Sequence, residues 1–212
     1  MVRLDHLTVV APTLREGAAH LRDCLDFDLQ FGTRHLYMGT HNHRLLLGRG
    51  VYLEVIALDP DGNAPGRPRW FGLDDQDQVR SDWEDGRRLR AWVASTDAMG
   101  PLLACHHEVF GEKVPLPSRD PTFDFAIPAD GSLPLNGAAP SLIDRRGIAE
   151  PLSAIPDLGA RLLSLTLVHP NPAAIVALYD EWKIDRPPSI MIGDKVRYRA
   201  EIETPDGVKL LT

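Results

Sequence analysis

The first sixty residues carry a hydrophobic pattern that predicts one strand, one helix and three further strands. Residues 4–10 are apolar, partly β-branched and followed by Ala11-Pro12, which is typical of a strand. Thr13 and Glu16 have the spacing of a capping box, and apolar residues then recur at helical spacing. Three more strand patterns follow, at 29–38, 43–47 and 51–57. The predicted order of this stretch is therefore β-α-β-β-β.

The same order of elements recurs twice further along the chain. The second series, a strand, a helix and three strands, lies at 89–94, 98–110, around 114, 123–127 and 141–143. The third series begins with a strand at 162–168 and a helix initiated by Asn171-Pro172, and it ends with strands at 189–192, 196–203 and 208–211. Residues 7–12 also resemble 165–170, and 50–53 resemble 207–210. This self-similarity indicates an internal repeat.

The repeat predicts a single domain over residues 1–212, built from modules at approximately 1–60, 88–147 and 160–212. Modules of this size are too small to bury a good core alone, so they are expected to interlock. The first module can pair with the second, leaving the third to cover them or to form a homodimer contact. Alternatively, the first pairs with the third and the second is inserted. The first arrangement is favoured because the third module is short.

Composition narrows the class of protein. Hydrophobic residues make up 43% and charged residues 25% of the 212 residues, as in ordinary globular proteins. The net charge of −7 argues against a nucleic-acid partner, which would need clustered Lys and Arg. No apolar run approaches the ~20 residues of a membrane span, and the start of the chain lacks a signal-peptide pattern. Two cysteines fit a reducing compartment, so we expect a cytoplasmic protein that handles a small molecule.

Two polar residues stand in strands that are otherwise apolar. Alternate residues of a strand share a face, so His6 lies with Thr8 on the first strand, and Glu54 lies with Tyr52 on the last strand of the first module. A buried charge without a partner is costly, so both groups need one. A divalent cation satisfies both, and an imidazole with a carboxylate suits Zn, Fe, Mn or Ni. A direct His–Glu ion pair without metal satisfies them equally.

Several segments resemble the glyoxalase-like domain proteins of the vicinal oxygen chelate (glyoxalase/bleomycin resistance/dioxygenase) superfamily. The segments that carry the resemblance are 4–9, Arg34-His35, 39–48, 52–57, Ser118-Arg119, 169–172 and 204–207. The resemblance implies an α+β fold of repeated βαβββ modules, whose strands form a curved, partly closed mixed sheet around a cavity. In metal-using members one ligand lies on the first strand of a module and one on the last, which implies metal ligands at His6 and Glu54.

The sequence departs from the four-ligand pattern that the superfamily usually has. In the second module, the position matching Glu54 is close to Asp144, and the other matching positions hold residues that do not bind metals. A three-ligand site of His6, Glu54 and Asp144 is therefore expected, with His35 or His43 as alternative third ligands. The alternative is a pocket that binds no metal.

Candidate catalytic residues come from the same region. His35 and His43 belong to a local histidine cluster around Gly39-Thr40, and a histidine can act as a general base near neutral pH. Glu54 is the third candidate, because a carboxylate beside the metal can also move a proton. The alternative for the cluster is a polar loop that happens to be rich in histidine.

Three further residues are candidate substrate contacts: Tyr52, Trp92 and Arg119. Arg119 can form a bidentate interaction with an anionic group of a substrate, although an arginine at such a position is as commonly an ordinary surface residue. Trp70, Phe71, Trp83 and Trp92 suit either the mouth of a pocket or a core. The connector at 59–86 is long for a loop, so it is expected to be functional or partly helical.

Two functions follow from these observations. The first is an enzyme of the vicinal oxygen chelate type, in which a divalent metal binds two substrate oxygens and supports isomerase, lyase or dioxygenase chemistry. The second is a metal-free protein that binds or sequesters a small molecule on the same fold. Fold alone does not choose between them, because one fold hosts many functions.

Overall fold

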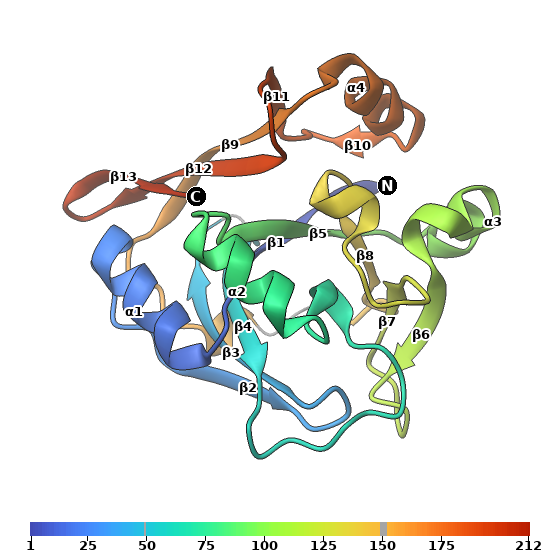
Figure 1. Ribbon diagram of the computed structural model, residues 1–212, viewed down its shortest axis with the longest axis horizontal. Helices are drawn as coiled ribbons and strands as arrows, with labels where there is room; N and C mark the ends of the chain where they lie inside the picture. Colours follow the sequence, from blue (N-terminus) through green and yellow to red (C-terminus); the bar gives the residue numbers. More distant parts are fainter. Residues whose placement is uncertain (49, 149–151) are drawn as a thin grey trace.

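A computed structural model describes residues 1–48, 50–148 and 152–212 (Figure 1). The strands are β1 (Val2–Val10), β2 (Phe31–His35), β3 (Thr40–Leu46), β4 (Tyr52–Leu58), β5 (Leu89–Ser95), β6 (Glu112–Leu116), β7 (Phe123–Ile127), β8 (Ser141–Asp144), β9 (Arg161–His169), β10 (Ile184–Asp185), β11 (Ser189–Ile192), β12 (Arg197–Thr204) and β13 (Gly207–Leu211). The helices are α1 (Leu14–Leu25), α2 (Gln76–Glu84), α3 (Met99–Phe110) and α4 (Pro172–Glu181), with short 3-10 turns η1 (Trp70–Gly72), η2 (Pro134–Gly137) and η3 (Leu152–Ala154).

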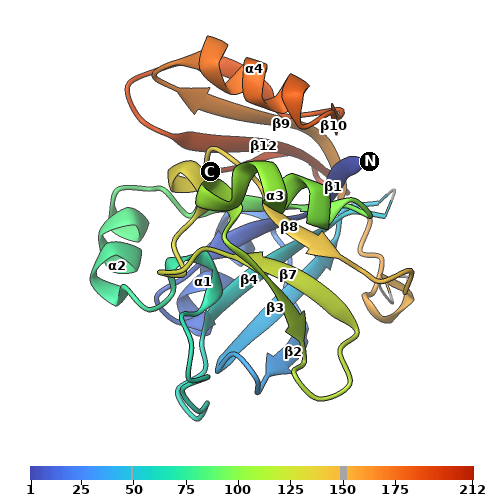
Figure 2. The ribbon, with the colours of Figure 1, turned by 90° about the vertical axis from the view of Figure 1, so that its right-hand side faces the viewer.

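The first two predicted modules share one sheet. Its strand order is β2-β3-β4-β1-β5-β8-β7-β6, and β10 adds to β1. Within each module the first strand pairs in parallel with the last, β1 with β4 and β5 with β8, and the modules join through the antiparallel pair β1–β5. The sheet curls so that its two wings, β2-β3-β4 and β6-β7-β8, face each other across the inner side of the curl (Figure 2). The predicted α+β fold with a curved, partly closed mixed sheet is confirmed.

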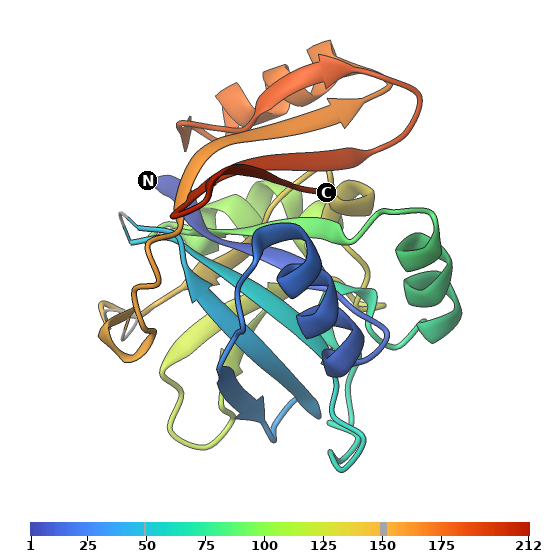
Figure 3. The ribbon, with the colours of Figure 1, turned by 90° about the vertical axis from the view of Figure 1, so that its left-hand side faces the viewer.

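The third stretch forms a sheet of its own, in the order β11-β9-β12-β13. It lies across the outer side of the curl, where β12 packs on β5 (Figures 1 and 3). The first strand, β9, pairs in parallel with β11 and antiparallel with β12, whereas β13 pairs with β12. The third stretch therefore differs from the first two in its strand pairing, and it contains an additional strand, β10, which joins the main sheet.

Tyrosine hydroxyls tie the second sheet to the first. Tyr179 on α4 donates to the carbonyl of Ala138 at 2.5 Å, and Tyr198 on β12 donates to the carbonyl of Gly137 at 2.8 Å. Both hydroxyls are buried, so these bonds satisfy groups that would otherwise lose their water without compensation.

Local sequence explains why α1 starts and where it packs. The Thr13 hydroxyl accepts from the backbone N–H of Glu16 at 3.2 Å and donates to its carboxylate at 2.7 Å, so the predicted capping interaction is confirmed. Gly17 then faces β4, where a Cβ would lie 2.3 Å from Val55 Cγ1. The missing side chain lets the helix approach the sheet closely.

The main sheet buries a different set of side chains on each face. On β1, Leu7 and Val9 belong to the apolar cluster that includes α1, α3 and the second sheet. Val10 belongs to the inner cluster within the curl, together with Ile56 of β4. The predicted alternation thus places His6 and Glu54 on the inner face. Among the described residues, no helix is long and apolar enough to cross a membrane.

Candidate functional site

Adjacent parallel strands bring the predicted His–Glu pair together. In the register of β1 and β4, His6 lies opposite Tyr52 and Thr8 opposite Glu54. His6 Nε2 lies 3.5 Å from a Glu54 carboxylate oxygen, and both residues are buried. The imidazole also stacks on the Tyr52 ring, with centroids 4.5 Å apart and an interplanar angle of 17°. The ring of His6 is therefore fixed from its face as well as from its nitrogens.

A β-bulge brings a second carboxylate to His6. The pairing of β1 with β5 shifts between Leu4 and His6, which leaves Asp5 as the extra residue. In a regular strand neighbouring side chains point to opposite faces, but here the Asp5 carboxylate lies 2.7 Å from His6 Nδ1. Arg145, just after β8, donates to the same carboxylate at 2.5 Å.

Glu54 is held from its other side by an amide. Asn42 on β3 donates to Glu54 Oε1 at 2.6 Å, and its own oxygen accepts from the backbone N–H of Thr33 at 2.7 Å. Arg145, Asp5, His6, Glu54 and Asn42 therefore form one continuous row of hydrogen bonds and ion pairs across the inner face.

The charges in this row favour a protonated His6. Burial opposes the imidazolium, but the hydrogen bonds and charges of Asp5 and Glu54 outweigh burial, so the pKa of His6 is raised above 6.5. Burial likewise opposes the charged form of both carboxylates, but the hydrogen bonds and positive charge of His6 outweigh it. The pKa of Glu54 is therefore lowered, and that of Asp5 falls to about 2. At pH 6.5 the row therefore contains mainly an imidazolium between two carboxylates.

The row forms one wall of a pocket of about 360 Å³ inside the curl. Its lining residues are His6, Thr33, His35, Tyr37, Asn42, Arg44, Tyr52, Glu54, Trp70, Phe71, Thr122, Phe123, Phe125, Ile143, Arg145 and Ile148. The volume is at the lower end of the ~300–1,000 Å³ that small-molecule sites occupy.

His35 is the second histidine of this pocket, and its charge state differs from that of His6. Burial lowers the pKa of His35, and the opposing charge of Glu54 does not restore it. His35 Nδ1 lies 3.1 Å from the Thr40 hydroxyl, and the ring meets Trp70 edge to face at 5.3 Å. The surroundings therefore shift the pKa values of the two histidines of this pocket in opposite directions, that of His6 upward and that of His35 downward.

Four of the predicted site residues line this pocket: His6, His35, Tyr52 and Glu54. His43 does not, because it alternates with Asn42 and Arg44 on β3 and lies on the outer face, where its ring meets Phe31 at 5.9 Å.

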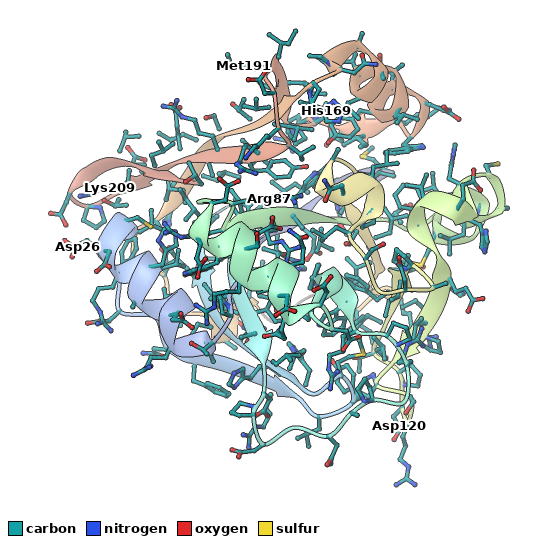
Figure 4. All side chains as sticks on the ribbon, in the orientation of Figure 1. Asp26, Arg87, Asp120, His169, Met191 and Lys209 are labelled. Atoms are coloured by element: carbon teal, nitrogen blue, oxygen red, sulfur yellow. The ribbon has the colours of Figure 1, made fainter. Side chains whose placement is uncertain are left out.

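Trp92, Arg119 and Asp144 also lie away from the pocket. Trp92 is buried on the outer face of β5, where its ring meets Tyr179 at 6.1 Å. Arg119 is exposed in the connection between β6 and β7, whose outer tip carries Asp120 (Figure 4). Asp144 follows Ile143, which faces the pocket, and so points to the other face of β8.

The described residues do not fit the metal site that the resemblance implies. No group of three or more His, Cys, Asp or Glu side chains in the described ranges is arranged to hold a metal, and Asp5 contacts His6 at Nδ1, the nitrogen that does not face Glu54. On β5 and β8 the corresponding inner positions hold Val93 and Ile143, which belong to the inner apolar cluster. Catalytic zinc sites take three protein ligands, one more than His6 and Glu54 supply.

The sequence interpretation assigned no role at the site to Asp5, Asn42 or Arg145, which the structure places in the row. Simple alternation puts Asp5 on the opposite face from His6, and the bulge that overrides it has no signal in the local sequence. The 59–86 connector does hold a helix, α2, as well as η1, where Trp70 and Phe71 line the pocket. Trp83 packs in the outer apolar cluster instead.

A curled mixed sheet with a His–Glu pair on its inner face is the architecture that the resemblance implies. Over residues 4–183 the sequence matches the glyoxalase-like domain. The chain therefore belongs to the glyoxalase-like domain family. No protein of curated function matches the sequence.

One solved structure agrees with this fold over most of the chain, and two others show a weaker likeness. A hypothetical protein from Staphylococcus aureus is similar with a TM-score of 0.64 at 12% identity, over 96% of this chain and 91% of that chain. A variant of Streptomyces coelicolor methylmalonyl-CoA epimerase, in complex with 2-nitronate-propionyl-CoA, has a TM-score of 0.40 at 14% identity, over 70% and 98% of the two chains. Methylmalonyl-CoA epimerase from Mycobacterium tuberculosis has a TM-score of 0.38 at 18% identity, over 71% and 91%. The first of these likenesses supports a shared fold, and none of the three supports a statement about activity.

Proposed function

We propose that this protein is an enzyme that moves a proton on a small carbonyl compound, using two histidines of the inner pocket. The observation that carries the proposal is that one cavity holds two histidines in opposite surroundings: His6 lies between the carboxylates of Asp5 and Glu54, which raise its pKa, whereas His35 packs against Trp70, and burial lowers its pKa. Titratable groups whose environments push their pKa values apart are the usual acid and base of a proton-transfer site.

His6 is the proton donor in this proposal. Its Nδ1 is engaged by Asp5 at 2.7 Å, whereas Nε2 is 3.5 Å from Glu54, beyond a full hydrogen bond. The Nε2 proton can therefore pass to a substrate oxygen that enters the pocket. Glu54 and Asp5 keep the imidazole charged and oriented until that transfer.

His35 is the proton acceptor. In the tautomer that donates its Nδ1 proton to the Thr40 hydroxyl, 3.1 Å away, Nε2 carries the lone pair, and this is the tautomer that the proposal uses. His35 Nε2 takes a proton from the carbon beside the carbonyl, the C–H electrons form a C=C bond, and the carbonyl oxygen takes the His6 proton. Return of the two protons regenerates a carbonyl, with the hydrogen or the double bond in a new position. The overall reaction is an isomerisation, so it needs no oxidant and no co-reactant.

Deuterium incorporation tests this proposal. The protein is incubated in D₂O with a panel of small ketones and aldehydes, and exchange at the carbon beside the carbonyl is followed by NMR. We expect His35→Gln and His6→Gln each to lower the exchange rate by about a hundredfold or more, the usual range for a general acid or base. His41→Gln is the matched control, because His41 lies on the outer face of β3. Exchange that persists in both pocket variants would refute the proposal.

A binding protein without chemistry is the second candidate. The observation that favours it is the mutual satisfaction of His6, Glu54 and Asn42, which leaves the inner row stable without a substrate. In the same experiment, this candidate predicts saturable binding of compounds with no exchange above the rate in buffer.

A further inference from the structure

Aromatic rings are concentrated in the inner pocket. Six of its sixteen described lining residues are Phe, Tyr or Trp, whereas these types make up 7% of the chain. Trp70, Phe71 and Phe125 are buried, and Phe123 is half-buried at the rim. A ligand that enters the pocket therefore meets ring edges and faces over much of its surface.

The rings form a connected wall around Trp70. Its ring meets Phe125 at 5.3 Å and Tyr37 at 6.2 Å, both near edge to face, and Phe71 meets Phe125 at 5.7 Å in the same manner. Edge-to-face and offset arrangements are those in which aromatic rings attract one another, so an aromatic guest can extend this network. A saturated ring of the same size cannot.

The wall is preorganised by the loop that carries it, residues 68–72, which we call the aromatic loop. Phe71 has a φ of 60°, a conformation that bulky residues rarely adopt. The backbone of this loop is fixed where Gly72 N–H donates to the Gly131 carbonyl at 2.8 Å, and the Arg69 side chain donates to the Met38 carbonyl at 2.9 Å. Binding a ring therefore does not require the wall to form first.

His35, the proposed base, lies at the aromatic end of the pocket, and His6, the proposed acid, lies at the polar end. His35 meets Trp70 at 5.3 Å, whereas His6 stacks on Tyr52 and is held by Asp5 and Glu54. A substrate that places its oxygen at His6 and its ring on the Trp70 wall presents the carbon between ring and carbonyl to His35. That carbon is also the more acidic one, because the ring stabilises the enol.

We propose that the substrate is a compact aromatic carbonyl compound with a C–H bond between the ring and the carbonyl. This proposal rests on the proposed function and deepens it by naming the substrate class. The aromatic wall contacts the ring of the substrate, and His6 binds the carbonyl oxygen. His35 takes the proton from the carbon between the ring and the carbonyl.

Phenylacetone and cyclohexylacetone test the substrate class, because they share a carbon skeleton and a ketone and differ in ring aromaticity. We expect phenylacetone to bind about tenfold more tightly, as two additional aromatic contacts would provide, with dissociation constants measured by NMR titration. Deuterium should enter at the carbon between the ring and the carbonyl. Equal affinity, tighter binding of cyclohexylacetone, or no saturable binding of either would overturn the proposal.

Variants of the wall provide a second readout that does not depend on the deeper core. Phe123→Leu changes a half-buried rim residue and should weaken phenylacetone binding about threefold while leaving cyclohexylacetone unchanged. Phe31→Leu is the matched control, because Phe31 is 56% exposed on β2 and does not line the pocket. An equal effect of Phe123→Leu on both ketones would overturn the aromatic preference.

The two proposals fail in different ways. If both ketones bind equally and exchange depends on His35, the proton-transfer function stands and the aromatic substrate class falls. If phenylacetone binds selectively without exchange in the wild-type protein, the proposed reaction falls, and with it this substrate proposal.

Discussion

Replacing Glu54 with glutamine removes one charge from the buried row and keeps the shape of the side chain. In Glu54→Gln, the new amide oxygen can still accept from Asn42, which donates to Glu54 Oε1 at 2.6 Å. The substitution therefore isolates the contribution of the carboxylate charge that lies 3.5 Å from His6 Nε2.

The distance sets the magnitude of the expected effect. Two unit charges 3.5 Å apart attract by about 5 kcal/mol at an effective dielectric constant of about 20. Loss of hydration offsets part of this attraction, and removing one partner of a buried pair typically costs about 3–5 kcal/mol. His6 keeps Asp5 as a partner, so we expect the free energy of unfolding to fall by about 3 kcal/mol. In a chain of this size that loss lowers the Tm by about 6–12 °C.

The loss should depend on pH with a defined sign. The pKa of Glu54 is lowered in the folded state, so its contribution is present above the ordinary value of 4.5 and is lost as the pH falls below it. The pKa of His6 is raised, so its contribution is present below the ordinary value of 6.5 and is lost as the pH rises through the raised value. The difference between wild type and variant should therefore be largest between pH 4.5 and 6.5.

Urea denaturation across a pH series measures this difference directly. The unfolding free energies of wild type and Glu54→Gln are compared at acidic, intermediate and alkaline pH. Glu108→Gln, at an exposed position on α3, is the control and should change the stability by less than about 0.5 kcal/mol. A loss that is the same at every pH, or no loss at all, would refute the charge assignment of the row.

Two further predictions concern the supports of the pocket. Asp82→Asn removes a carboxylate that lies 2.9 Å from Arg90 Nε and 3.2 Å from Arg87 Nη1, and all three side chains are buried. The unfolding free energy, measured by urea denaturation, should therefore fall by about 3–5 kcal/mol. A loss below about 1 kcal/mol would contradict this account. Gly131→Ala puts a Cβ 2.2 Å from the backbone of the aromatic loop, whereas Gly86→Ala has a similar positive φ and meets nothing within 4 Å. We expect Gly131→Ala to cost at least about 1 kcal/mol more than Gly86→Ala and to weaken aromatic ketone binding in NMR titrations, and equal behaviour would contradict the supporting role.

Local pattern was sufficient for the elements and for the centre of the site. The period-two alternation of β1 and β4 put His6 on one face with Thr8 and Glu54 on one face with Tyr52, because successive side chains of a strand point to opposite faces. Thr13 predicted the start of α1, because the groups that cap a helix are close in sequence. The resemblance to glyoxalase-like proteins rested on the same strands, so it gave the right family.

The members of the row and the aromatic wall depended on contacts between distant segments. Asp5 reaches His6 through a bulge in the β1–β5 pairing, and Arg145 reaches Asp5 from beyond β8. Asp144, expected as a ligand, points away because its strand register is set by the pairing of β8 with β5. The sequence similarity between the first and third stretches did not predict which strands pair. The third stretch forms a separate sheet with a different strand order.

The sequence by itself thus determined the strands apart from β10, which residues of β1 and β4 share a face, and that His6 and Glu54 stand on the first and last strands of the first module. The tertiary structure alone decided the neighbours of that pair: a second carboxylate, an amide, a second histidine with the opposite pKa shift and a wall of rings. The physical reason is that alternation and capping act between residues a few positions apart. Bulges, registers and loop positions are set instead by packing between segments that meet only after folding.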